Sequence, residues 1–155
     1  MQPLRIEHYL HSHIPLSKAM GVQVLSATPD AVRLSAPLAP NLNHRETVFG
    51  GSASALAILA AWTLLHVRLE AEGTNEDGHH FRNARLVIQR NNMHYEKAMA
   101  GTFYAVARAP ETALWKKFTH MLARKHRARI KTSAVLECAG EQAGALEGEF
   151  VAFLI

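Results

Sequence analysis

An apolar segment over residues 51–67 begins at the second residue of a glycine pair and contains no Asp, Glu, Lys or Arg. A lone membrane span needs about 20 predominantly apolar residues. This run is shorter and includes two serines, a threonine and a histidine, so we interpret it as a core helix, with Ser52 or Ser54 in its first turn or capping it. Because apolar residues cover nearly every face, we expect other structure to wrap residues 51–70.

The whole chain has the length and composition of one globular domain over residues 1–155. Of its 155 residues, 48% are hydrophobic and 19% are charged, which excludes disordered and repeat classes. Cys138 is the only cysteine, so an internal disulfide is excluded and a reducing compartment is favoured. The first 16 residues carry charges and histidines where a secretion signal needs an apolar core, so we expect a cytoplasmic protein.

Hydrophobic periodicity predicts further helices and several strands around the core helix. Helical period occurs over residues 4–13 and 110–126, and the expected apolar faces are Leu4, Tyr9 and Leu10 in the first and Leu114, Phe118, Met121 and Leu122 in the second. Period-two alternation predicts two strands within 22–38 and one each over 84–95, 101–109, 129–140 and 144–155. We expect 84–95 and 101–109 to pair antiparallel. The result is an α+β fold in which an antiparallel sheet curls around one helix.

Three stretches of the sequence carry a resemblance to a known family. They are "IPLSKAMGVQVLSA" (14–27), "NLNHRETVFGGSASALAILAAW" (41–62) and "NMHYEKAMAGTFYAVARA" (92–109). The chain resembles the hotdog-fold thioesterases from about Ile14 to Phe153. Within them it is most similar to the group of thioesterase domains that occur alone or fused behind an acetyltransferase.

The resemblance implies a fold, an assembly and a substrate class. The helix from Gly51 would be the core around which the strands wrap. Two subunits would form a homodimer whose sheets continue edge to edge, and such dimers can pair into a dimer of dimers. The active sites would lie at that interface, near the helix N-terminus. The substrate would be an acyl thioester of coenzyme A or of acyl carrier protein, and no separate cofactor would be needed because coenzyme A belongs to the substrate.

The glycine pair, Gly50 and Gly51, has a chemical interpretation and a structural one. A helix N-terminus has unpaired backbone N–H groups and partial positive charge, and thioester hydrolysis passes through an oxyanion that needs such donors. Glycine lets a substrate carbonyl approach the backbone closely. Gly50 and Gly51 are therefore the candidate oxyanion donors. The structural alternative is that they permit a tight turn and close packing of the helix.

Three polar residues before the glycines are candidates for positioning or activating water. The resemblance gives Asn43 a role in positioning substrate or water, whereas a loop Asn commonly bonds its own backbone. Glu46 is the acid nearest to the helix start and could act as general base, or be a solvated loop acid; it replaces a Gly that is usual in the motif. Histidine can act as a base near neutral pH, so His44 is a candidate base, but it also fits an exposed loop position.

The expected helix lacks the acid that several hotdog thioesterases place about two turns into it. Ile58 occupies that place, and the helix from Gly51 contains no acid before Glu70. Another subfamily has its catalytic group on the facing strand, where this chain has Ile88. This absence leaves two hypotheses open, a thioester hydrolase and a non-hydrolytic acyl-thioester binding module.

Substrate binding, metal binding and nucleic-acid binding can also be weighed from the sequence. The candidate substrate-binding residues are Ser52, in the first helical turn, and two arginines, Arg85 and Arg90, which could contact the phosphates of coenzyme A. The alternative is that the arginines lie on a solvated face.

The net charge is +4, but the basic run 123–131 lacks the interleaved aromatics of a nucleic-acid binder. Pairs of histidines at 11 and 13 and at 79 and 80 have no third ligand at a convincing spacing, so no metal site is expected.

Overall fold

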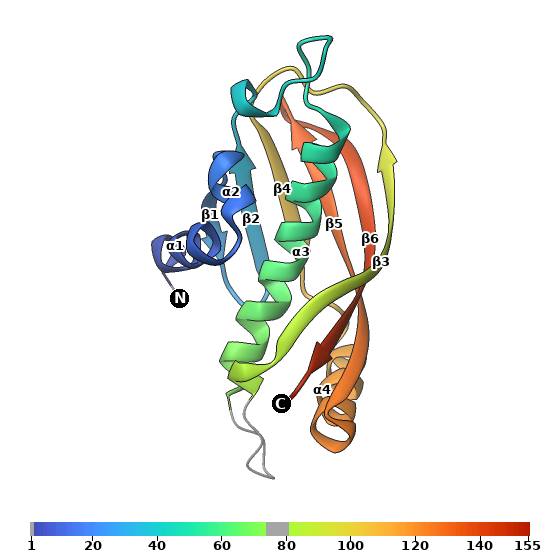
Figure 1. Cartoon of the computed structure of the whole chain (residues 1–155). Helices are drawn as coiled ribbons and strands as arrows, with labels where there is room; N and C mark the ends of the chain where they lie inside the picture. The colour runs from blue at the N-terminus through green and yellow to red at the C-terminus, as the bar shows by residue number, and fades with distance from the viewer. Residues whose placement is uncertain (1, 74–80) are drawn as a thin grey trace.

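The computed structural model describes residues 2–73 and 81–155, and it shows a curved sheet wrapped around one long helix (Figure 1). That helix is α3, Gly50–Glu72. The strands are β1 (Gln23–Ala27), β2 (Ala31–Ala36), β3 (Arg85–Tyr95), β4 (Phe103–Arg108), β5 (Arg127–Cys138) and β6 (Glu141–Phe153). The other helices are α1 (Pro3–His13), α2 (Pro15–Ala19) and α4 (Thr112–Lys125), with 3-10 turns at Ala39–Asn41 and Phe81–Asn83. The α+β hotdog arrangement expected from the sequence is confirmed.

All neighbouring strands are antiparallel, in the order β1-β2-β4-β5-β6-β3. The expected pairing of residues 84–95 with 101–109 is wrong, because β3 pairs with β6 and β4 lies between β2 and β5. The segment after β3 crosses the end of the sheet, where the Val48 amide donates to the Met99 carbonyl at 2.8 Å. β6 pairs with ten of the 11 residues of β3, whereas β4 has only six residues, so pairing with β6 satisfies more backbone groups. β3 is consequently an edge strand.

The core forms where the inward faces of the strands meet α3. Leu56, Leu64 and Leu65 of α3 are completely buried, because the curved sheet covers most of the circumference of the helix. α3 has the length and apolar composition of a membrane span, but 61% of its most apolar window is buried inside the protein, so it serves here as the core helix. The period-two alternation of β5 buries every second residue from Ala128 to Leu136, and Cys138 at the end of the strand is half-buried.

The two amphipathic helices differ from the expected faces at their margins. In α1 the buried residues are Ile6 and Leu10, whereas Leu4 is 75% exposed. In α4, Phe118 and Leu122 are buried as expected, together with Trp115, whereas Leu114 and Met121 are exposed. Both differences have one cause: each helix packs on the curved sheet along a narrow stripe, so residues at the edge of an apolar face remain in water.

Candidate functional site

The N-terminus of α3 presents free backbone donors. The helix begins at Gly50 with Phe49 as N-cap, and the first bond within it runs from the Ala53 amide to the Phe49 carbonyl at 3.0 Å. The amides of Gly50, Gly51 and Ser52 precede that bond, at the positive end of the helix dipole. Of the two alternatives for Ser52 and Ser54, a place at the start of the helix is confirmed for Ser52 in the first turn, whereas capping is wrong: no side chain of the described residues caps α3, and the Ser54 hydroxyl donates to the Gly51 carbonyl at 3.4 Å.

Two aromatic side chains flank these glycines, and the sequence interpretation did not include them. The Tyr95 hydroxyl, at the end of β3, donates to the Gly50 carbonyl at 3.2 Å, and a Cβ added at Gly50 would lie 3.5 Å from the Tyr95 ring. A Cβ added at Gly51 would lie only 2.3 Å from the Phe49 ring. Phe49 and Tyr95 are 55% and 59% exposed. Their signal in the sequence was an aromatic directly before the glycine pair and a tyrosine at a strand end.

Asn43 lies at the centre of the loop that leads into α3. Its side-chain oxygen accepts the amides of Arg45 at 2.8 Å and Thr47 at 3.1 Å, and its side-chain nitrogen donates to the Thr47 hydroxyl at 2.8 Å. The Asn43 amide also donates to the Thr47 carbonyl at 2.8 Å. This arrangement fits the structural alternative for Asn43, because its polar atoms organise the loop. A direct role in catalysis remains a prediction.

Asn41 is a second loop residue that the sequence interpretation missed. Its side chain is buried, and the side-chain nitrogen donates to the carbonyls of Met20 at 2.9 Å and Pro37 at 2.8 Å. Its own carbonyl accepts the amide of Phe49 at 2.8 Å. Asn41 therefore ties the end of β2 and the segment after α2 to the residue that starts α3, and it positions the glycine pair.

Glu46 and His44 are exposed in the same loop, before the glycine pair. Glu46 adopts a φ of +62°, a left-handed conformation that glycine adopts without cost and other residues adopt at about 1–2 kcal/mol. This geometry explains why glycine suits the position. Glu46 takes this conformation with its side chain exposed, in the loop that leads to the glycine pair.

The candidate arginines are distant from the glycine pair within one chain. Tyr95 is beside Gly50, and Arg85 is ten residues away at the other end of β3, about 33 Å in an extended strand. Arg90 is exposed and 3.8 Å from Glu149. The single chain therefore does not bring Arg85 and Arg90 together with Gly50 and Gly51.

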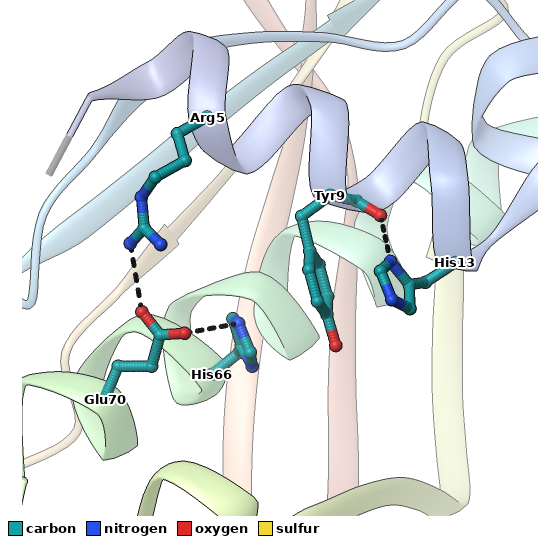
Figure 2. A network of polar contacts seen from close by, with 5 residues as sticks. All are labelled: Arg5, Tyr9, His13, His66 and Glu70. Atoms are coloured by element: carbon teal, nitrogen blue, oxygen red, sulfur yellow. Dashed lines mark hydrogen bonds and ion pairs between the residues drawn. The ribbon is translucent and has the colours of Figure 1, made fainter.

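The first acid along α3 is Glu70, which belongs to a separate cluster beneath α1 (Figure 2). Glu70 lies 3.1 Å from Arg5 and 3.4 Å from His66, whose pKa is lowered mainly by burial. Twenty residues separate Glu70 from Gly50, about 30 Å along a helix, so this carboxylate cannot reach its own glycine pair. Ile58 and Ile88 pack against the core.

Within the described residues, no group of three or more His, Cys, Asp or Glu side chains is placed to hold a metal ion. His13 instead bonds the Tyr9 carbonyl through Nδ1 at 2.9 Å, and His11 bonds the Val22 carbonyl at 2.8 Å. His79 and His80 lie outside the described residues.

Residues 4–154 match the family described as "Putative thioesterase (yiiD_Cterm)". The chain belongs to this thioesterase family. A crystal structure of a "putative thioesterase" from Shewanella oneidensis is similar to it, with 26% identity, coverage of 98% of this chain and 97% of that chain, and a TM-score of 0.83.

Two further crystal structures share the fold at lower identity. A protein of unknown function from Chlorobaculum tepidum has 24% identity, covers 99% of this chain and 94% of its own, and gives a TM-score of 0.87. A "Probable Thioesterase" from Pseudomonas aeruginosa has 16% identity, with 99% and 96% coverage and a TM-score of 0.78. Together with the family match, they confirm the assignment to the hotdog thioesterase superfamily.

Proposed function

We propose that this member of the thioesterase family hydrolyses acyl thioesters of coenzyme A or acyl carrier protein at the N-terminus of α3. The observation that carries the proposal is the family match over residues 4–154. The amides of Gly50 and Gly51 support it, because they lie ahead of the first intrahelical bond and can donate to an oxyanion.

The residues around the helix start suggest how the substrate would lie. The thioester carbonyl would accept from the glycine amides, between the rings of Phe49 and Tyr95. Ala55, Ile58 and Trp62 are half-buried and follow Gly51 at helical spacing, so they offer an apolar stripe for the acyl chain. Glu46 would activate water, while Asn43 would hold the loop that carries Glu46. Ser52 contributes its amide and lies one position further into the helix.

We propose that the active unit is a homodimer formed through β3. β3 is a long edge strand, and exposed edges of this kind are normally paired or covered. In one chain the glycine pair is open to solvent, whereas small-molecule sites are usually enclosed. Antiparallel pairing of two β3 strands about a two-fold axis would place the partner's Arg85 near Tyr95, beside Gly50. The partner's Arg85 would then supply the site with the cation that is too distant within one chain.

A steady-state assay across acyl-CoAs of graded chain length, with detection of the free thiol, tests hydrolysis. We expect turnover above background for at least one chain length. Absence of turnover with every acyl-CoA and with acyl carrier protein substrates, alongside measurable binding, would overturn hydrolysis.

That outcome would favour the second function, a non-hydrolytic acyl-thioester binding module. The observation behind it is that α3 has no acid before Glu70 and has Ile58 about two turns after its start, whereas the family resemblance leads us to expect an acid there. The binding module would retain the glycine amides as carbonyl donors but would have no group able to activate water.

A further inference from the structure

A groove of about 660 Å³ lies between α4 and the start of β5, away from the proposed site. It is lined by Leu114, Lys117, Phe118, Met121 and Lys125 of α4 and by Arg127, Ala128 and Arg129 of β5. The α4 residues recur every three or four positions, so they follow one face of that helix. The first and last of them are 11 positions apart, which corresponds to about 16 Å along the helix. The groove is therefore long and linear, and a short helix would fit along it.

The groove has an apolar floor. Phe118 and Ala128 are buried at its base, whereas Leu114 and Met121 are 41% and 38% exposed. Apolar side chains left in water along a concave surface are typical of interaction sites. The floor can therefore accept the apolar face of a partner.

The rims of the groove are basic. Residues 116–131 contain seven Lys and Arg and no Asp or Glu, while the rest of the chain has ten Lys and Arg against 13 Asp and Glu. Lys117 and Lys125 form no ion pair with another described residue. Arg127 lies over the Phe153 ring, and Arg129 is 3.9 Å from Glu149. The positive charge of the protein is thus concentrated around an apolar groove.

We propose that this groove docks an acidic amphipathic helix of a carrier protein that delivers the acyl thioester, an inference that rests on the proposed function. The apolar side of such a helix would lie on Leu114 and Met121, and its carboxylates would meet the basic rims. A bilayer favours apolar side chains that protrude from a surface, and this apolar surface is recessed. A single-stranded nucleic acid needs exposed aromatics for stacking, whereas Phe118 is buried.

The position of the groove suits delivery to a second subunit. The Trp115 indole of α4 donates to the Glu72 carboxylate at 3.3 Å, so α4 lies where α3 ends (Figure 1). This is about 33 Å along the helix from Gly50 of the same chain. β3 runs from this end of the molecule to Tyr95, so antiparallel pairing of two β3 strands brings the partner's glycine pair to the groove. A carrier docked on one subunit would supply the site of the other.

Binding of an apo acyl carrier protein, without its phosphopantetheine, tests the docking surface by isothermal titration calorimetry at low ionic strength. The groove variant is Lys117→Glu with Lys125→Glu. The matched control is Lys116→Glu with Arg124→Glu, which changes the charge equally at exposed α4 positions outside the lining. We expect the groove variant to raise Kd by about tenfold or more and the control by about twofold at most. Neither should change kcat/KM for acyl-CoA.

A second variant removes the exposed apolar side chains of the groove without changing its charge. Leu114→Ser with Met121→Ser should also raise Kd, and it keeps the test available if the glutamate variant fails to fold. Far-UV circular dichroism checks the folding of every variant.

Four outcomes would overturn the docking proposal. The wild-type protein could fail to bind the carrier, or could bind phosphatidylserine vesicles in its place. The control variant could raise Kd for the carrier as much as the groove variant does, or the groove variant could raise KM for acyl-CoA by the same factor as Kd for the carrier. Because the carrier has no thioester, the measurement does not depend on turnover. Carrier binding that is lost in the groove variant, in a protein without hydrolysis, would support docking while overturning the enzymatic function.

Discussion

At the scale of single residues, Glu46 combines a chemical candidate with a strained backbone. Glu46→Gln keeps the φ of +62° and removes the charge, so we expect unchanged thermal stability and a kcat about 100-fold lower, the contribution typical of a general base. Glu46→Gly should also lose activity but gain about 1 kcal/mol in the free energy of unfolding, because glycine relieves the strain. Thioester turnover and urea denaturation measure the two effects.

His44→Gln is the control for this pair, since His44 is exposed in the same loop. It should leave turnover unchanged. A Glu46→Gln variant with wild-type kcat would remove Glu46 from the catalytic machinery and leave the partner subunit as the source of the base.

Thr63 is an unusual residue inside α3. It is completely buried, and its hydroxyl has no hydrogen-bond partner among the residues that the structure describes. An unsatisfied buried hydroxyl is costly, so Thr63→Val should raise the free energy of unfolding by about 1 kcal/mol. Thr119→Val is the matched control, because the Thr119 hydroxyl donates to the Trp115 carbonyl at 3.2 Å and its loss should destabilise. Urea denaturation that shows both variants less stable would contradict the assignment for Thr63.

At the scale of elements, α1 is held on α3 by stacked rings and an ion pair. Tyr9 stacks between His13 and His66, with ring centroids 4.1 and 4.9 Å away, and Trp62 stacks on His66 at 4.9 Å. Figure 2 shows Glu70 reaching both Arg5 and His66 beside this stack. Burial lowers the pKa of His66 most strongly, Glu70 raises it, and Arg5 and His13 lower it.

The lowered pKa of His66 predicts a pH dependence of stability. In the unfolded chain the pKa of His66 returns to about 6.5, so below that pH the unfolded state binds a proton that the folded state resists. Stability from neutral His66 is therefore full above pH 6.5 and is lost as the pH falls toward the folded pKa. We expect His66→Gln to reduce the loss of unfolding free energy between about pH 7.5 and pH 5.5, measured by urea denaturation.

Glu70→Gln gives an opposite expectation for the same interval. Without the carboxylate the pKa of His66 should fall further, which widens the pH window and steepens the loss of stability. Identical slopes in the wild type and in His66→Gln would show that other histidines cause the acid sensitivity.

At the scale of the whole molecule, the proposed dimer predicts the mass of the protein in solution and predicts that this mass depends on the β3 edge of the sheet. Sedimentation equilibrium should give twice the chain mass, or four times if dimers pair again. Asn91 and Asn92 are exposed on β3, directly after its middle residue, Arg90, and lysines there would gather positive charge around the two-fold axis, where like charges repel. Asn91→Lys with Asn92→Lys should therefore give monomers with little thioester turnover.

A control variant for the β3 edge adds the same charge at positions outside β3. Asn83→Lys with Gln142→Lys changes exposed residues outside β3 and should remain dimeric. A wild-type protein that sediments as a monomer, yet hydrolyses acyl thioesters normally, would contradict the proposed dimer.

Much of the architecture could be predicted because it depends on local patterns. The buried helix, the period-two strands and the exposed loop residues before Gly50 follow from side-chain periodicity and turn chemistry, which neighbouring residues specify. The pairing of residues 84–95 could not be predicted this way. Short connections favour local pairing, and only the length of β6, far along the chain, makes the alternative ladder better.

The features of the candidate site also fall into two groups, those that local sequence specifies and those that depend on distant contacts. The sequence by itself determined that an apolar helix begins behind two glycines and that its N-terminal amides are available, because helix geometry leaves them unpaired whatever surrounds them. Only the tertiary structure decided that Tyr95 and Phe49 flank those glycines, that the side chain of Asn43 is engaged in its loop, and that Arg85 lies at the far end of β3. These features depend on contacts between residues distant in the chain, and local patterns do not specify which distant surfaces meet.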